Sequence, residues 1–277
     1  MPGVLVIVGS SPTASTILEV TIGVATMEKR IQETLERIEW EHDVKVLYAC
    51  ESGSRAWGFA SRDSDYDVRF IYQRSLSHYL SLGKRRDVIE LPIDDELDVS
   101  GWDISKALTL LRNGSATLQE WLNSPIVYSR DVVFLAQMKY LASLSARPAA
   151  LFHHYFSMAR NERERLAAGE VNAKRYAYML RTLLAAMWVA EHRTPPPVRF
   201  YELKARMLGG GPIVTEVDAL LERKAMGNEK EVIRPVLAID CFADAQFEAL
   251  ETVRFEPVDK LDLETMDRFF MQMLNAA

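Results

Sequence analysis

The amino-acid sequence predicts an α+β fold, in which a domain of mixed helices and strands precedes a helical domain. Short apolar runs of strand length alternate with helical spacing in the first half of the chain. After about residue 131 only helical spacing recurs, and breakers such as Gly169 and the Gly-Gly-Gly-Pro run at 209–212 separate the helices. We therefore predict a mixed domain over residues 27–130 and a helical domain over residues 131–277.

Composition excludes several classes of protein. The chain has 277 residues, of which 48% are hydrophobic and 26% are charged, as in ordinary globular proteins. No apolar run reaches the roughly 18 residues that a membrane span requires. The net charge of -6 argues against a protein whose whole surface wraps nucleic acid. Cys50 and Cys241 are too few for a disulfide scaffold, so we expect buried free thiols and a cytoplasmic location.

The first 26 residues carry the weakest pattern. The apolar run Val4–Val8 has no Lys or Arg before it, which argues against a secretory signal. The first clear helical spacing begins at Met27 and continues through Ile31, Leu35 and Ile38. Residues 1–26 are therefore expected to be an extension or an overlong start, and the alternative is an edge strand packed on the domain.

Periodicity predicts the remaining elements in order. Strands are expected at 45–50, 67–72, 88–91 and 96–102, and helices at 104–112, 132–144, 149–168, 172–192, 214–223, 233–252 and 262–274.

The most informative stretch runs from residue 51 to residue 72. The first predicted strand ends at Gly53-Ser54, and Asp65 and Asp67 open the next strand. Side chains of a strand alternate between faces, so Asp65, Asp67 and Arg69 are expected on one face. Two neighbouring carboxylates repel each other unless a cation lies between them, and magnesium prefers such oxygen ligands. A Gly-Ser turn also lets backbone amides approach a phosphate, so the pattern is typical of phosphoryl or nucleotidyl transfer.

Two other interpretations of these aspartates compete with this one. Asp63, Asp65 and Asp67 have the spacing of a calcium loop, but Val68 and Arg74 stand where that loop needs Gly and an acid. The alternative is a solvated acidic turn, which is the usual explanation for an isolated Asp-x-Asp. The preceding strand and Gly-Ser turn favour the phosphate-handling interpretation.

The motif and several longer segments of the sequence resemble a known superfamily. Gly53-Ser54 followed by Asp65-Tyr66-Asp67 is similar to the signature of the DNA polymerase β-like nucleotidyltransferases. The segments GSRAWGFASRDSDYDVRFIY, GWDISKAL, LQEWLNSPIVY and KRYAYMLRTLLAAMW resemble the branch known as YcgL or RlaP, which is associated in some members with RNA repair. The resemblance begins near Met27 and implies a polymerase β-like palm, a mixed sheet with helices, followed by a helical domain.

The resemblance also implies a metal site. It implies two magnesium ions, with manganese as a substitute, and gives Asp65 and Asp67 the first two ligand positions. Asp98 is the favoured third acid because it stands between two apolar residues, and Asp103 is its competitor. Asp103 directly precedes a predicted helix, where it is better suited to be an N-cap. Asp94-Asp95 are expected to be loop acids.

Nucleotide-binding candidates follow in two groups. Gly53 and Ser54 are expected to hold the terminal phosphates of a nucleoside triphosphate, and Arg69 to neutralise developing charge or to pair with a carboxylate. On one helix, Lys174, Tyr178 and Arg181 lie within about 60° of one another. By analogy with related transferases they face the nucleotide, and the alternative is a plain solvent-facing side.

Two hypotheses for the function remain open. The first is an enzyme that transfers a nucleoside monophosphate from a triphosphate to an RNA end, a protein side chain or a small molecule. The second is a nucleotide sensor of the same fold with little turnover. Arg160, Arg163, Arg165, Lys174 and Arg175 could form a local basic patch for a nucleic-acid acceptor.

Overall fold

The structure is a computed structural model that describes residues 14–61, 63–83, 86–93, 96–226 and 231–275. The chain divides into two compact units, residues 1–44 and residues 45–277.

The first unit contains one long helix, α1 (Ala14–His42). The helix includes the predicted spacing from Met27 to Ile38 but begins well before it. Residues 14–26 are therefore helical, and the alternative of an edge strand is wrong for them. The apolar run Val4–Val8 lies outside the described residues.

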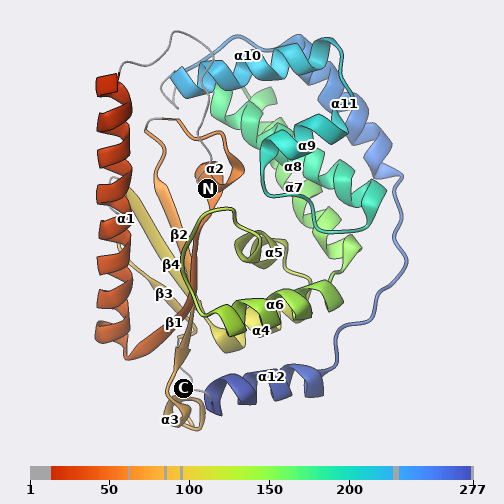
Figure 1. The fold of residues 1–277 in the computed structure, drawn as a ribbon. Coiled ribbons are helices and arrows are strands. Elements are labelled where there is room, and N and C mark those ends of the chain that lie inside the picture. The colour runs from red at the N-terminus through yellow and green to blue at the C-terminus, as the bar shows by residue number, and fades with distance from the viewer. Residues whose placement is uncertain (1–13, 62, 84–85, 94–95, 227–230, 276–277) are drawn as a thin grey trace. The chain divides into compact units, whose positions relative to one another are not determined.

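The second unit is built on a mixed five-stranded sheet (Figure 1). Its strands are β1 (Val44–Glu51), β2 (Tyr66–Arg74), β3 (Val88–Glu90), β4 (Leu97–Asp103) and β5 (Val127–Arg130), in the order β3-β4-β2-β1-β5. β2 and β4 are parallel, whereas β3 pairs antiparallel with β4 and β5 pairs antiparallel with β1. The mixed sheet confirms the predicted α+β class and the four predicted strands.

Helices make up the rest of the described part of this unit. They are α2 (Gly53–Trp57), α3 (Leu76–Tyr79), α4 (Ile104–Arg112), α5 (Ala116–Leu122), α6 (Val132–Leu144), α7 (Pro148–Ala167), α8 (Ala173–His192), α9 (Phe200–Met207), α10 (Pro212–Met226), α11 (Leu237–Glu251) and α12 (Leu263–Asn275). Each helix predicted between 104 and 274 is present. The prediction missed α2, α3, α5, α9 and β5, because elements this short show too little periodicity.

Two hydrophobic cores hold the second unit together. One core joins α2 to helices α7, α8, α9, α10 and α11, with Trp57 and Phe59 packed among them. The other joins the sheet to α4, α5, α6 and α12, and Figure 1 shows α12 beside α4 and α6. Segments from both predicted domains thus share each core, and the compact units do not divide at residue 130.

Two smaller expectations can be compared with the structure. Both cysteines are free, but only Cys50 is buried; Cys241 is exposed, so the expectation of two buried thiols is wrong for it. Among the helices that the structure describes, none combines the length and the apolar character that crossing a bilayer demands.

Candidate functional site

Strand pairing brings Asp67 and Asp98 together. The two residues are direct partners in the parallel register of β2 and β4. Residues at paired positions of neighbouring strands carry their side chains on the same face of a sheet. Each side chain is 28% exposed, so both carboxylates are partly withdrawn from water. With Asp65, which precedes β2 and is exposed, they form what we call the acid cluster.

Arg69 joins the two carboxylates. Its Nη2 atom lies 2.9 Å from Asp67 Oδ1 and 2.7 Å from Asp98 Oδ2. The predicted placement of Asp67 and Arg69 on one strand face is therefore confirmed. Of the two roles considered for Arg69, the structure shows the pairing with carboxylates.

Gly53 lies directly against the acid cluster. Its φ of +59° falls in the left-handed region, and a Cβ atom there would stand 2.1 Å from Asp67 Oδ2. No side chain larger than hydrogen fits in this space. The Gly-Ser turn and the second aspartate, 14 positions apart in the sequence, are thus in contact.

Arg55 fixes the backbone before Asp67. Its guanidinium lies 3.6 Å from the centre of the Tyr66 ring and donates to the carbonyl oxygens of Ser64, at 2.7 Å, and Asp65, at 3.1 Å. Asp94-Asp95 lie outside the described residues.

Asp103 is an N-cap, as predicted. Its Oδ1 accepts hydrogen bonds from the backbone N–H of Ser105, at 2.8 Å, and from the Ser105 hydroxyl. Its Oδ2 accepts from the Tyr79 hydroxyl at 3.1 Å. A buried carboxylate whose oxygens are both engaged in this way is poorly placed to bind an ion shared with Asp67.

The electrostatics of the acid cluster follow from burial. Burial raises the pKa of the Asp67 carboxyl, and Asp98 and Asp65 raise it further. Arg69 and Lys174 act in the opposite direction. Nearby positive charge therefore offsets part of the rise in the pKa of Asp67.

Glu51 is a site residue that sequence analysis missed. It has no exposed surface, its Oε1 accepts from the backbone N–H of Asp67 at 2.8 Å, and its Oε2 accepts from the Tyr128 hydroxyl. Its backbone oxygen accepts from Ser124 Oγ at 2.6 Å. Glu51 thus fixes the main chain of Asp67 beside Gly53. The only sequence signal was a carboxylate ending an otherwise apolar strand, KVLYACE.

Glu51 also predicts a dependence of stability on pH. Burial raises its pKa from 4.5 to about 7, so folding favours the protonated form. The stability that this preference contributes is complete below the unfolded-state pKa and is lost as the pH rises through about 7. Glutamine cannot ionise, so the stability of Glu51→Gln should not fall in this way. As the pH rises from acidic to mildly alkaline, the free energy of unfolding of Glu51→Gln minus that of wild type should increase by on the order of 1–3 kcal/mol.

Chemical denaturation across this pH range measures that difference. The exposed Glu248 provides a matched control, Glu248→Gln. A difference between Glu51→Gln and wild type that stays constant with pH would contradict the prediction.

The three candidates on α8 face α2 instead of plain solvent. Tyr178 packs edge-on against Trp57, with ring centres 5.0 Å apart. Lys174 lies one turn earlier, 5.9 Å from the Tyr178 ring, and its charge acts on Asp67. The structure therefore places Lys174 and Tyr178 on the side of α8 that adjoins the helix beginning at Gly53.

Arg181 is placed differently from the other two. It is 1% exposed and its Nη1 lies 2.7 Å from Glu120 Oε1. Its guanidinium also lies 4.5 Å from the Trp57 ring. Glu120 in turn accepts from Trp57 Nε1 at 3.1 Å and from the Tyr155 hydroxyl at 2.7 Å. The structure thus gives Arg181 a place in a buried ion pair that holds α2, and does not bring it to the acid cluster.

Lys224 on α10 is a second residue that sequence analysis missed. It is 2% exposed and donates to the carbonyl oxygen of Phe59 at 2.9 Å. The segment that leads from α2 to Asp65 is therefore held by a residue 165 positions away. No local pattern in the sequence marks it.

The predicted basic patch is largely neutralised. Arg163 pairs with Asp240 and Asp244, and Arg175 with Glu162 and Glu170. Arg165 pairs with Glu162 as well. Charges already paired contribute little to binding a polyanion.

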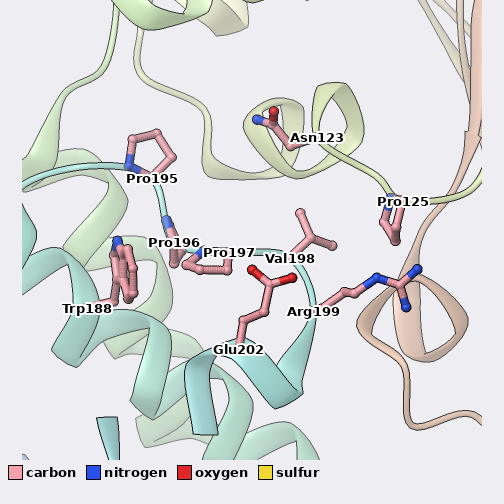
Figure 2. A pocket seen from close by; sticks show the side chains of 9 residues that line it. All are labelled: Asn123, Pro125, Trp188, Pro195, Pro196, Pro197, Val198, Arg199 and Glu202. Carbon is pink, nitrogen blue, oxygen red and sulfur yellow. The ribbon is translucent and has the colours of Figure 1, made fainter. Parts of the chain in front are cut away.

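A separate pocket of about 390 Å³ lies near the triproline segment (Figure 2). It is lined by Asn123, Pro125, Trp188, Pro195, Pro196, Pro197, Val198, Arg199 and Glu202. No member of the acid cluster lines it. Arg199, which extends toward Pro125 in Figure 2, is the nearest side chain to the Cβ position of Gly58, at 3.9 Å.

The residues present fit a magnesium ion in their chemistry. Asp65, Asp67 and Asp98 offer only carboxylate oxygens, which hard divalent cations prefer. Across the described ranges, however, no three His, Cys, Asp or Glu side chains are arranged to hold an ion together. At the Asp67–Asp98 pair, the compensating positive charge comes from Arg69.

Comparisons with known proteins found a family model, a relative of similar length and a solved structure. The model of the family described as "RNA repair pathway DNA polymerase beta family" (RlaP) matches residues 27–272. The protein described as "Uncharacterized protein YcgL" from Bacillus subtilis (strain 168) is 41% identical over 239 residues, which cover 86% of this chain and 92% of that protein. A solved structure of a nucleotidyltransferase-like protein from Exiguobacterium sibiricum 255-15 has a TM-score of 0.29 and 12% identity, covering 79% of this chain and 74% of that one. A likeness this low supports no inference.

Proposed function

The chain belongs to the RNA repair pathway DNA polymerase beta family, and from this premise we propose that it is a magnesium-dependent nucleotidyltransferase. It would move a nucleoside monophosphate from a triphosphate to a hydroxyl acceptor and release pyrophosphate. The observation that carries the proposal is the contact of Gly53 with Asp67, with Asp98 paired beside it. This arrangement places a glycine turn and two carboxylates at one point on the sheet.

Each residue has a role in the proposed reaction. Asp65, Asp67 and Asp98 would hold the divalent ions, with manganese able to replace magnesium. The ions, when bound, lower the pKa of the attacking hydroxyl and neutralise charge on the phosphates. Gly53 and Ser54 would border the terminal phosphates. Glu51 would keep Asp67 in position through its backbone N–H.

The acceptor is an RNA end, a protein side chain or a small molecule. The name of the family favours an RNA end. Pairing of Arg163, Arg165 and Arg175 with acids argues against a broad electrostatic groove on that part of the surface. We therefore propose that an RNA acceptor would be bound over a short segment near its end.

One observation favours the alternative, a nucleotide sensor with little turnover. Arg69 already supplies one positive charge to the Asp67–Asp98 pair, so the pair depends less on a metal ion for its stability. A sensor would bind triphosphates without releasing pyrophosphate.

Pyrophosphate release separates the two functions. The protein is incubated with each labelled triphosphate, magnesium or manganese, and RNA, protein or metabolite pools in separate reactions. Release of pyrophosphate with transfer of label to one pool supports the transferase. Binding of a triphosphate with no pyrophosphate release in any of these reactions would support the sensor.

Lys174 is predicted to contribute to triphosphate affinity. It lies on the side of α8 that adjoins α2 and acts electrostatically on Asp67, so it can reach a phosphate bound beside that residue. Lys174→Ala should weaken triphosphate binding by roughly tenfold, the effect of losing one charge-assisted hydrogen bond. Calorimetry measures the affinity, and Lys204→Ala, on α9, is a control of the same charge change. Unchanged affinity in Lys174→Ala would remove this residue from the binding site.

A further inference from the structure

Arg69 is held more firmly than a surface arginine. Besides its two contacts with carboxylates, its Nη1 donates to the carbonyl oxygens of Val68, at 3.1 Å, and Asp98, at 3.0 Å. The side chain is 17% exposed. The guanidinium therefore makes four hydrogen bonds within the sheet face that carries the acid cluster.

The guanidinium uses the oxygens that a metal ion would use. Nη2 of Arg69 bridges Oδ1 of Asp67 and Oδ2 of Asp98, and an ion shared by these two oxygens would occupy the same position. Two cations at one pair of carboxylates also repel each other. Arg69 in its present position and an ion bridging these two oxygens are mutually exclusive.

We propose that Arg69 is the resident counter-ion of the Asp67–Asp98 pair, and that a divalent cation bridges Asp67 Oδ1 and Asp98 Oδ2 by displacing its guanidinium. The inference rests on the proposed function for the identity of the ion. Once displaced, the guanidinium needs a new anionic partner, and the phosphates of a triphosphate are suitable in charge and geometry. Metal binding is then weak without nucleotide and strengthens when nucleotide is present.

Manganese binding to the full chain tests the competition without relying on activity. Free Mn²⁺ is measured by electron paramagnetic resonance during titration of the protein in the absence of nucleotide. Arg69→Met should bind Mn²⁺ at least about tenfold more tightly than wild type, because the ion no longer competes with a charge-assisted pair. The Mn²⁺ affinity of Arg69→Lys should lie between those of wild type and Arg69→Met, since one ammonium cannot reproduce the four contacts of the guanidinium.

A matched variant separates competition from a general loss of positive charge. Arg55→Met removes a nearby charge that faces the main-chain oxygens of Ser64 and Asp65, so it should not tighten Mn²⁺ binding. Circular dichroism checks that each variant is folded. If Arg69→Met does not fold, the comparison is made between Arg69→Lys and wild type. Equal or weaker binding in the Arg69 variants, or equal tightening in Arg55→Met, would overturn the inference.

The outcomes also distinguish this inference from the proposed function. Tighter Mn²⁺ binding in the Arg69 variants without pyrophosphate release by wild type would support the inference and contradict the transferase. Pyrophosphate release by wild type with unchanged Mn²⁺ affinity in the Arg69 variants would support the transferase and contradict the inference.

Discussion

Replacing Asp67 by Asn is expected to lower the rate of pyrophosphate release by on the order of a thousandfold or more. Asparagine keeps the shape of the side chain but removes the charge that an ion requires. Asp67 contacts Gly53 and pairs across the strands with Asp98, so no other described residue can take its place without moving the backbone. The rate is measured under saturating triphosphate, so that weaker binding of the triphosphate does not add to the loss.

Asp103→Asn is the matched control. Asp103 caps α4 and accepts from Tyr79, and asparagine caps a helix about as well as aspartate, so this variant should keep a rate near that of wild type. Asp98→Asn should behave like Asp67→Asn. A loss of activity in Asp103→Asn together with an active Asp98→Asn would show that the third acid has been assigned to the wrong residue.

Gly53→Ala is expected to lower the rate by about a hundredfold, the usual effect of displacing a reacting group by about 1 Å. The new Cβ would stand 2.1 Å from Asp67 Oδ2, so the carboxylate has to move. The left-handed backbone adds a cost of about 1–2 kcal/mol to stability. The rate and the free energy of unfolding are measured on the same preparation, because the two effects have different causes.

Gly58→Ala separates steric displacement from backbone strain. Gly58 also has a left-handed backbone, with φ of +87°, but its Cβ position is open and the nearest heavy atom is Arg199 Nη1 at 3.9 Å. This variant should lose stability by a similar amount and keep its rate. If both glycine variants lost activity equally, the contact between Gly53 and Asp67 would not be the cause.

Local sequence patterns predicted a large part of the fold. The longer helices from Ile104 onward and the strands on both sides of the Gly-Ser turn follow from the spacing of apolar residues, which reflects backbone geometry within one element. The N-cap role of Asp103 was also predictable, because capping depends only on the few residues that follow it.

The surroundings of Glu51 and Arg181 could not be predicted in this way. Tyr128 and Asp67 meet Glu51 from other segments of the chain, and Glu120 reaches Arg181 from α5. The same helical spacing is compatible with a solvent-facing arginine and with a buried ion pair. Only the packing of α8 against α2 decides between them.

The sequence by itself determined the α+β class, the order of most elements and the motif in which Gly53-Ser54 precedes Asp65 and Asp67. These properties depend on residues close together along the chain, whose geometry the backbone restricts. The tertiary structure alone decided that Asp98 lies beside Asp67, that Gly53 is pressed against its carboxylate, and that Arg69 supplies the compensating charge. Those contacts depend on strand register and on burial, which arise only when distant segments pack and water is excluded from the charges between them.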